Sequence, residues 1–591
     1  MRRGPRWTQV ASWNSQRQLG PPPAQQSFDH KLSSLVVAVL QLGSSAASTQ
    51  SALEQKAVDS LPTTGKRQVS AEVDHLLRDL GLEGQFAGSD LQSLINQRIV
   101  PHLSERIVSS LGPFSKRKTI EYLGARLGKA ARAHAETVVL GRENVSTEVW
   151  RHSVSLATGS SRSWQLILEL ALARPPSGTK SLRALNDRKL LRHADDLYFW
   201  SQLSDRLHYS LGDPILIVNN SNSLVAGLHQ TLDIGRWNHD LAKWMKGRGT
   251  DEQFGPLGEL AVALAERRSP PDTAFAAKAD AAFCHSLGFS LSTLVSLMGA
   301  LAENSKSLVS RSSQLIKRYE LDTWVAGQGL QADAPRALDF LIFHGDPRPL
   351  VASRLYESAQ RLNTHPLPAL PNGSILVIPS WVATSGTVYG KYLVEAAWPA
   401  SLSDNIEGTE LRALLDEEER ALNRMLEIEI VQSLWEAGYP AYGPVGSGDH
   451  IGIPALRLPG EIDVIALDPI NRRVVVIEAK DERQIHSMKA LSRQVRKWWV
   501  GDASHAAKLL DKVSAVSASV EVIPEAVLRF QNSIRQSALP PQMPGQPGDD
   551  EPWSVSGVIV SREPTMAGAY YERSVPPVWL SELPRFMGVT E

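Results

Sequence analysis

Residues 460–480 read GEIDVIALDPINRRVVVIEAK and decide the fold of the C-terminal part of the chain. An apolar run that ends at Leu467 and a second run over residues 474–477 flank the segment DPINR. The first apolar run is followed by turn-forming residues, and the second run is rich in β-branched residues, so the pattern predicts a β-hairpin. Because both runs are nearly continuous rather than alternating, we expect strands that are buried on both faces under helices.

Three charged residues stand at the ends of these two strands. Asp463 precedes the first strand, and fourteen residues separate it from Glu478, which is followed by Ala479 and Lys480. Side chains alternate across a strand, so Glu478 and Lys480 should share one face, with Asp463 close enough to join them. Three charged groups facing one pocket are costly unless they have a binding or catalytic role.

The types of these residues are those of a metal site. Mg²⁺ prefers oxygen ligands and is usually held by one or two carboxylates together with a substrate phosphate. Asp463 and Glu478 would supply the carboxylates, and the backbone carbonyl of Ala479 a third oxygen. Lys480 would orient the attacking water or stabilise charge on the phosphate. The pattern predicts phosphodiester hydrolysis with Mg²⁺ as cofactor and Mn²⁺ as a substitute; the alternative is a solvated strand end.

The set Asp463…Glu478-Ala479-Lys480 resembles the PD-(D/E)XK, or restriction-endonuclease-like, nuclease superfamily. The phrases GEIDVIA and VIEAK are typical of its bacterial members, although Ile462 stands where the family often has proline. The resemblance covers about residues 410–590 and implies an α/β domain with a mixed central sheet flanked by helices. It implies an endonuclease acting on DNA in restriction, phage defence or repair, and it leaves RNA open as a substrate.

The resemblance also implies a further acid on the helix before the sheet. Residues 426–438 read LEIEIVQSLWEAG, an apolar helical pattern that ends at Gly438, a natural C-terminal stop. Glu427 lies one turn before the apolar stripe and is the better candidate for a catalytic acid, with Glu429 second. The alternative is that Glu427 is an exposed helix acid.

A basic helix is predicted after Lys480. Spacings of three and four residues gather cationic side chains on one helical face, where they would contact nucleic-acid phosphates: Lys489, Arg493, Arg496 and Lys497. Gln494, four residues before Trp498, is similar to a Gln-x-x-x-Tyr element of some relatives, with tryptophan replacing tyrosine. The alternatives are a solvated helix face and, for Gln494, an ordinary helix-surface residue.

The rest of the chain predicts a multidomain protein with a mainly α N-terminal region. We expect four segments: a disordered tail at 1–27, a mainly helical region of unknown role at 28–345, a small mixed linker module at 346–409, and the nuclease-like domain at 410–591. The linker module should contain strands at residues 374–378 and 387–393. The helical region would recognise a target, a protein partner or a second copy of the chain.

Composition sets outer limits on partners and location. The net charge of −1 gives no bulk attraction to nucleic acid, so DNA binding must come from local patches. The single cysteine, Cys284, excludes an intramolecular disulfide and is expected to be buried in a core helix. The apolar stretch 283–302 is interrupted by serines and is expected to be a core helix rather than a membrane span. We expect a cytoplasmic protein with no membrane contact.

One alternative function belongs to a different class. The nuclease fold could be retained for structure or nucleic-acid binding in a non-enzymatic interaction scaffold. The intact set of two acids and a lysine favours the enzyme, because a decayed site need not keep all three.

Overall fold

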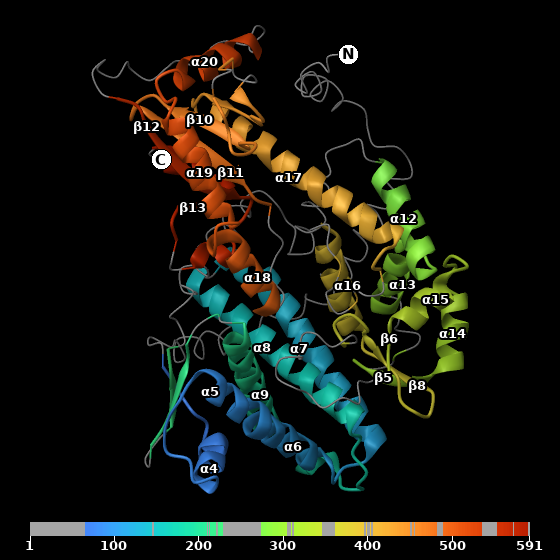
Figure 1. The fold of residues 1–591 in the computed structure, drawn as a ribbon. Helices are drawn as coiled ribbons and strands as arrows, with labels where there is room; N and C mark the ends of the chain where they lie inside the picture. Colours follow the sequence, from blue (N-terminus) through green and yellow to red (C-terminus); the bar gives the residue numbers. More distant parts are fainter. Residues whose placement is uncertain are drawn as a thin grey trace. The chain divides into compact units, whose positions relative to one another are not determined.

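A computed structural model describes most of the chain from residue 66 to residue 588. The gaps are residues 145–146, 210, 212, 220–222, 228–272, 304–308, 310–311, 345–360, 395–397, 399–401, 403–405, 449–451, 454–455, 482–487, 535–551 and 571–572. The described residues form a mixed α/β structure dominated by helices (Figure 1). They divide into two compact units, with the boundary after Glu417 inside helix α17 (Glu410–Glu436). The tail predicted at 1–27 lies outside the described residues.

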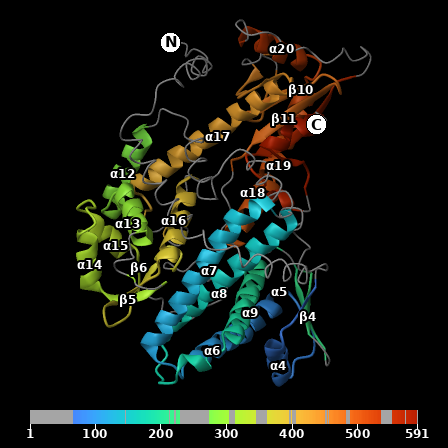
Figure 2. The same cartoon turned by 180° about the vertical axis from the view of Figure 1, so that it is seen from behind.

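The N-terminal unit begins with a layer of helices around one apolar core. Its helices are α4 (Ala71–Asp79), α5 (Gly88–Leu94), α6 (Val100–Leu111), α7 (Lys116–Asn144), α8 (Thr147–Ala173) and α9 (Asp187–His208). The long helices α7, α8 and α9 lie side by side in both directions of view (Figures 1 and 2). A π-helical turn, Ile95–Ile99, leads into α6, which has Pro101 in its first turn.

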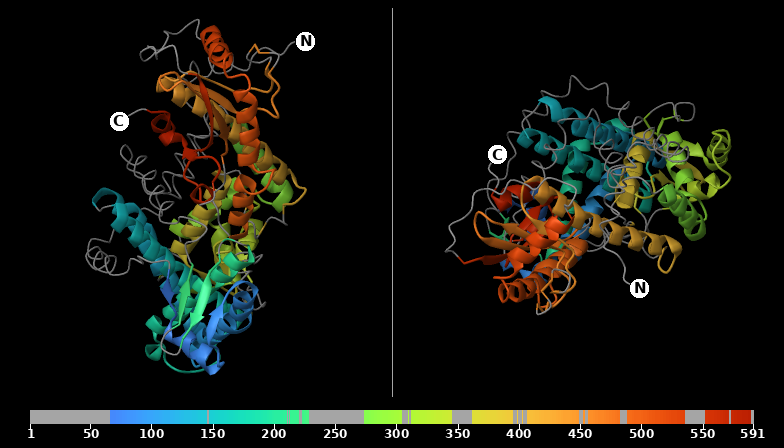
Figure 3. Two further views of the ribbon diagram at one scale, coloured as in Figure 1. Left: turned by 60° about the vertical axis from the view of Figure 1, so that its left-hand side comes forward. Right: turned by 90° about the horizontal axis from the view of Figure 1, so that it is seen from above.

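A small sheet lies beside α5 in this layer. Its strands, in the order β1-β4-β3-β2, are Arg67–Gln68, Leu224–Ala226, Ile215–Val218 and Gly84–Phe86, and all neighbours are antiparallel. The left view of Figure 3 shows the green strands against the blue helices. Leu216 and Val225 are buried in the same core as Leu91 of α5, so the sheet and the helices share their apolar interior.

A second group of helices completes the N-terminal unit. They are α12 (Thr273–Leu287), α13 (Leu291–Glu303), α14 (Arg318–Ala326), α15 (Ala334–Phe340) and α16 (Pro379–Val394). Two strand pairs join them: β5 (Gln314–Lys317) with β8 (Ser374–Val377), and β6 (Ile342–Phe343) with β7 (Leu367–Pro368). Each pair links a strand before residue 346 to a strand after it. The boundary predicted at residue 345 therefore does not separate a module, because the two sides share sheets and a core.

One predicted strand of that segment is a helix. Residues 374–378 contain the expected strand, β8, but residues 387–393 belong to α16. The buried residues Trp381, Ser385 and Tyr389 recur every four positions, which is the spacing of one helical face. All three donate hydrogen bonds to backbone carbonyls of the segment 362–364. Packing against this segment overrides the strand preference of the β-branched residues.

The apolar stretch 283–302 is two helices rather than one. Gly288 has a φ of +83° and ends α12, and α13 begins three residues later after Ser290, whose Oγ accepts from the backbone N–H of Thr293 at 3.0 Å. The two parts are bent by 85°. Within the described residues no single helix is long and apolar enough to cross a membrane, and only this bent pair has the length and apolar composition for it. Cys284 is exposed, which corrects the expectation of a buried thiol.

The C-terminal unit is built on a five-stranded mixed sheet. Its order is β13-β12-β11-β10-β9, from strands Pro577–Trp579, Ser554–Ser561, Arg473–Ala479, Val464–Asp468 and Ala441–Tyr442. The hairpin β10–β11 is confirmed: its strands are antiparallel, and Arg472 in the turn has a φ of 44°. Strands β12 and β13 run parallel to β11. Every residue of β10 is buried, as the continuous apolar pattern predicts.

Helices cover both faces of this sheet. On one face α17 and α21 (Leu583–Met587) bury Leu426, Ile430 and Leu434 against Val475 and Ile477. On the other face α19 (His505–Ser517) packs on β11 and β12, beside α18 (Met488–Trp499). The short helix α20 (Ile523–Ile534) contacts β9 and β10.

Candidate active site

The register of the hairpin brings the two predicted acids together. Val464 pairs with Ile477, so Asp463, one residue earlier, and Glu478, one residue later, end up as neighbours. Asp463 Oδ2 accepts a hydrogen bond from the backbone N–H of Ala479 at 2.7 Å. This bond holds the Asp463 carboxylate at the C-terminal end of β11, close to Glu478 on the same strand. The predicted proximity of the two acids is therefore present.

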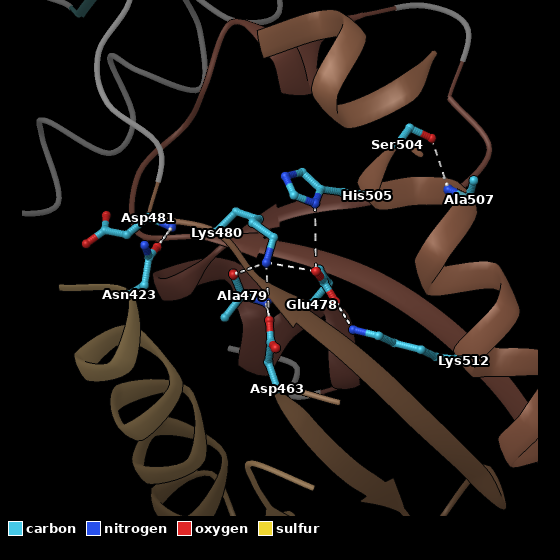
Figure 4. A network of polar contacts seen from close by, with 10 residues as sticks. All are labelled: Asn423, Asp463, Glu478, Ala479, Lys480, Asp481, Ser504, His505, Ala507 and Lys512. Carbon is cyan, nitrogen blue, oxygen red and sulfur yellow. Dashed lines mark hydrogen bonds and ion pairs between the residues drawn. The ribbon is translucent and has the colours of Figure 1, made fainter. Parts of the chain in front are cut away.

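Lys480 lies between these acids. Its Nζ is 2.8 Å from Glu478 Oε1 and 3.4 Å from Asp463 Oδ2, and it donates to the carbonyl oxygen of Ala479 at 3.0 Å (Figure 4). The Ala479 side chain points the other way, into the core under α17, as strand alternation requires. Three oxygen atoms from three different residues thus converge on one cationic nitrogen.

Two further residues of the site come from α19 and have no counterpart in the sequence prediction. Lys512 Nζ donates to Glu478 Oε2 at 2.5 Å, and His505 Nδ1 lies 3.8 Å from Glu478 Oε1. Figure 4 shows both side chains reaching the glutamate from the helix. The spacing of seven residues puts them on one helical face, two turns apart. The sequence shows this spacing, but no neighbouring residue indicates which strand this face of the helix would contact.

The protonation of the site follows from burial and from these lysines. Burial is the largest influence on Asp463 and raises its pKa, although the charge of Lys480 acts in the opposite direction. Burial also acts to raise the pKa of Glu478, but the charges and hydrogen bonds of Lys480 and Lys512 outweigh it, so that pKa is lowered. Burial acts to lower the pKa of Lys480, but the two acids raise it above its ordinary value. Glu478 and Lys480 are therefore charged at neutral pH.

Glu427 interacts electrostatically with charged residues of the site. Burial and the nearby carboxylates of Asp463 and Glu461 raise the pKa of Glu427 to about 7. The predicted acid therefore lies within electrostatic range of the hairpin acids and exchanges its proton near neutral pH. Glu429, the second candidate, forms an ion pair with Arg562 instead.

Arg562 joins three segments at this edge of the sheet. It follows β12, is 6% exposed, and donates from Nε to Asp481 Oδ2 at 3.1 Å in addition to its pair with Glu429. The backbone N–H of Asp481 donates to Asn423 Oδ1 of α17 at 3.2 Å. This network, in which the side chains of Arg562 and Asp481 are buried, holds α17 against the residue that follows Lys480, and so supports the position of the site.

The basic helix is present, with one correction. In α18, Arg493, Arg496 and Lys497 are exposed, and Trp498 on the opposite face is fully buried. Gln494 is 6% exposed and faces inward, so it is not a helix-surface residue available to a nucleic acid. Lys489 belongs to α18, but its side chain is outside the described residues.

The donor set at the hairpin fits a hard cation. Within the described parts of the chain, no group of three or more His, Cys, Asp and Glu side chains forms a metal site. The oxygens around Lys480 Nζ are two carboxylates and one carbonyl, which is a set that Mg²⁺ accepts when water or phosphate completes its shell. In this structure the positive charge that these oxygens surround is the ammonium group of Lys480.

Comparisons of this chain with family models, with curated proteins and with solved structures give no match.

Proposed function

We propose that the C-terminal unit is a metal-dependent nuclease of the PD-(D/E)XK type that hydrolyses phosphodiester bonds, with DNA as its substrate. The observation that carries this proposal is the convergence of Asp463 Oδ2, Glu478 Oε1 and the Ala479 carbonyl on Lys480 Nζ. The order of elements supports it: a helix, an antiparallel hairpin, further helices, and then a strand parallel to β11.

In this proposal each residue has a defined role. Asp463, Glu478 and the carbonyl of Ala479 would hold a Mg²⁺ ion, which supplies an activated water and neutralises phosphate charge. Lys480 donates hydrogen bonds, and its charge stabilises the negative charge that develops on the phosphate. Glu427, with a pKa of about 7, is matched to accept or return a proton near neutral pH. Arg493, Arg496 and Lys497 would bind backbone phosphates without reading sequence.

The experiment is digestion of a panel of single-stranded and double-stranded DNA and RNA by the full-length chain with Mg²⁺ or Mn²⁺. We expect cleavage by the wild type and at least a ~100-fold loss in Lys480→Ala, the scale of removing one electrostatic catalytic group. Lys508→Ala is the matched control, since Lys508 is exposed on the neighbouring helix α19 and should leave the rate unchanged. Equal cleavage by Lys480→Ala and wild type would refute this site.

A second candidate function rests on the balance of charge in the site. The carboxylates of Asp463 and Glu478 face two lysines, Lys480 and Lys512, so their charges are compensated within the chain. Such compensation favours the alternative of a non-enzymatic scaffold that keeps the fold for nucleic-acid binding. Calorimetric titration with Mg²⁺, with and without DNA, separates the two. Binding that Asp463→Asn abolishes supports the enzyme, and no binding in the wild type supports the scaffold.

A further inference from the structure

The two oxygens of the Glu478 carboxylate have different surroundings. Oε1 faces Lys480 Nζ at 2.8 Å, with His505 Nδ1 at 3.8 Å, on the side shared with Asp463 and the Ala479 carbonyl. Oε2 faces away from that point and accepts from Lys512 Nζ at 2.5 Å. One oxygen therefore belongs to the predicted metal site, and the other is occupied by a lysine of α19.

Lys512 is fixed in this position by the packing of its helix. The Lys512 side chain is 9% exposed, whereas the Lys480 side chain is 19% exposed. Helix α19 begins with a cap in which Ser504 Oγ accepts from the backbone N–H of Ala507 at 3.2 Å. The helix lies close to the sheet at Gly557, where a Cβ atom would stand 2.9 Å from Val513 Cγ2. If Lys512 moved away from Glu478, both charges would be left buried without a partner, which is strongly destabilising.

This arrangement bears on the number of metal ions. Sites with two metals hold them about 3.5–4 Å apart, clamped between shared ligands. Glu478 would be the bridging ligand here, since its Oε1 faces the side shared with Asp463 and its Oε2 faces Lys512. We propose that Lys512 is a built-in cation that takes the place of a second metal, so that the site binds one divalent ion. The inference rests on the metal site of the proposed function.

Charge supports the same conclusion. The two carboxylates already face the charges of Lys480 and Lys512. A second divalent ion beside Lys512 would place two cations against one carboxylate oxygen in a buried site, where repulsion is screened less than in water. Replacing Lys512 by a neutral residue removes that repulsion and leaves Oε2 open to a metal.

The test counts bound ions and does not depend on cleavage. Mn²⁺ is titrated into the full-length chain, and free Mn²⁺ is followed by electron paramagnetic resonance. We expect about one site-bound Mn²⁺ in the wild type and in Lys512→Arg, which keeps the charge, and about two in Lys512→Gln. Lys508→Gln, exposed one turn earlier on α19, is the matched control and should bind as the wild type does. Asp463→Asn, which should lose the ion, identifies the site-bound fraction.

The outcomes separate this inference from the proposed function. Two site-bound ions in the wild type would overturn it even if DNA is cut, and so would one ion in a folded Lys512→Gln protein. One ion in the wild type and two in Lys512→Gln, with no cleavage of any nucleic acid, would support the inference and remove the nuclease assignment. A wild type that binds no Mn²⁺ overturns the inference, and if Lys512→Gln fails to fold, the count in the wild type and in Lys512→Arg decides.

Discussion

Gly557 of β12 lies against Leu509 of α19 so closely that a Cβ atom at position 557 would stand 3.0 Å from Leu509 Cγ. The φ of Gly557 is not in the left-handed region, so the backbone conformation does not require glycine here. The requirement comes from the lack of space for a side chain. In the sheet Gly557 pairs with Val476, two residues before Glu478 on β11. The close approach of α19 at this point is what brings Lys512 within reach of Glu478.

We expect Gly557→Ala to destabilise the C-terminal unit by about 1–3 kcal/mol, because an added methyl group must push α19 outward or strain two side chains. Urea unfolding followed by circular dichroism measures the change. The control is Gly159→Ala, in the interior of α8, where a Cβ would have no neighbour within 4 Å. That substitution should stabilise its helix by up to about 1 kcal/mol. Equal effects of the two substitutions would contradict the packing argument.

Removal of Arg562 should be more damaging than removal of any exposed arginine. Arg562→Met leaves the buried carboxylate of Asp481 without its cation, and breaking a buried ion pair in this way costs about 3–5 kcal/mol. Arg529→Met removes an exposed pair with Glu525, whose side chains are 71% and 75% exposed, and should cost less than about 1 kcal/mol. Urea midpoints of the two variants test the difference. A similar small shift in both would show that the Arg562 network does not hold α17 to the sheet.

The hairpin and its three charged residues could be predicted because the signals are local. Turn residues and two short apolar runs set the register, and the register alone makes Asp463 and Glu478 neighbours. Lys512 could not be predicted, since its contact with Glu478 depends on how α19 docks on a different strand. Gly557 controls that docking, and its sequence context indicates only a strand residue.

The assignment of residues 387–393 failed for a related reason. Their β-branched and aromatic residues favour a strand, and a single sequence gives no sign of the segment at 362–364 that they would meet. The hydrogen bond from Tyr389 to the carbonyl of Thr364, 2.7 Å long, is part of the tertiary contact that settles the helix. Short apolar runs are ambiguous between helix and strand when periodicity is the only guide.

Glu427 should make the stability of the C-terminal unit fall as pH rises. Its folded pKa of about 7 lies above the ordinary value of 4.5, so the native state holds a proton that the unfolded state releases between these values. The stabilising effect is complete below about pH 4.5 and is lost as pH rises through 7. After allowance for partial solvent screening, Glu427→Gln should be about 1–2 kcal/mol more stable than wild type at about pH 8 and similar to it at about pH 5. Glu436→Gln, exposed on the same helix, is the control.

Urea unfolding at the two pH values measures this difference. A Glu427→Gln variant that tracks the wild type at both would mean that Glu427 does not keep its proton near neutral pH. The same variant provides a check on the site, because the carboxylate of Asp463 is one cause of the shift. In Asp463→Asn, the advantage of Glu427→Gln at high pH should be smaller.

His365 should have the opposite dependence on pH. Burial lowers its pKa to about 4, so the unfolded state, with a pKa near 6.5, binds a proton that the native state does not. Stability of the N-terminal unit should therefore fall as pH decreases from about 6.5 towards 4, by about 2 kcal/mol between pH 8 and pH 5. His365→Phe removes the titrating group and should flatten this part of the curve. His75→Phe, whose side chain is 77% exposed, is the control for replacing a histidine by phenylalanine outside the core.

Removal of the exposed cations of α18 should weaken the binding of nucleic acid and reduce its dependence on salt. Each phosphate contact that is lost reduces the slope of log affinity against log salt by about 1, so Arg493→Ala with Arg496→Ala should reduce it by about 2. The loss should be similar for all sequences, because these contacts read the backbone rather than base edges. Fluorescence anisotropy with labelled DNA at several salt concentrations, without metal so that no cleavage occurs, measures both quantities. Arg529→Ala, exposed on α20, is the control and should leave the slope unchanged; a double variant with the wild-type slope would place the nucleic acid on another surface.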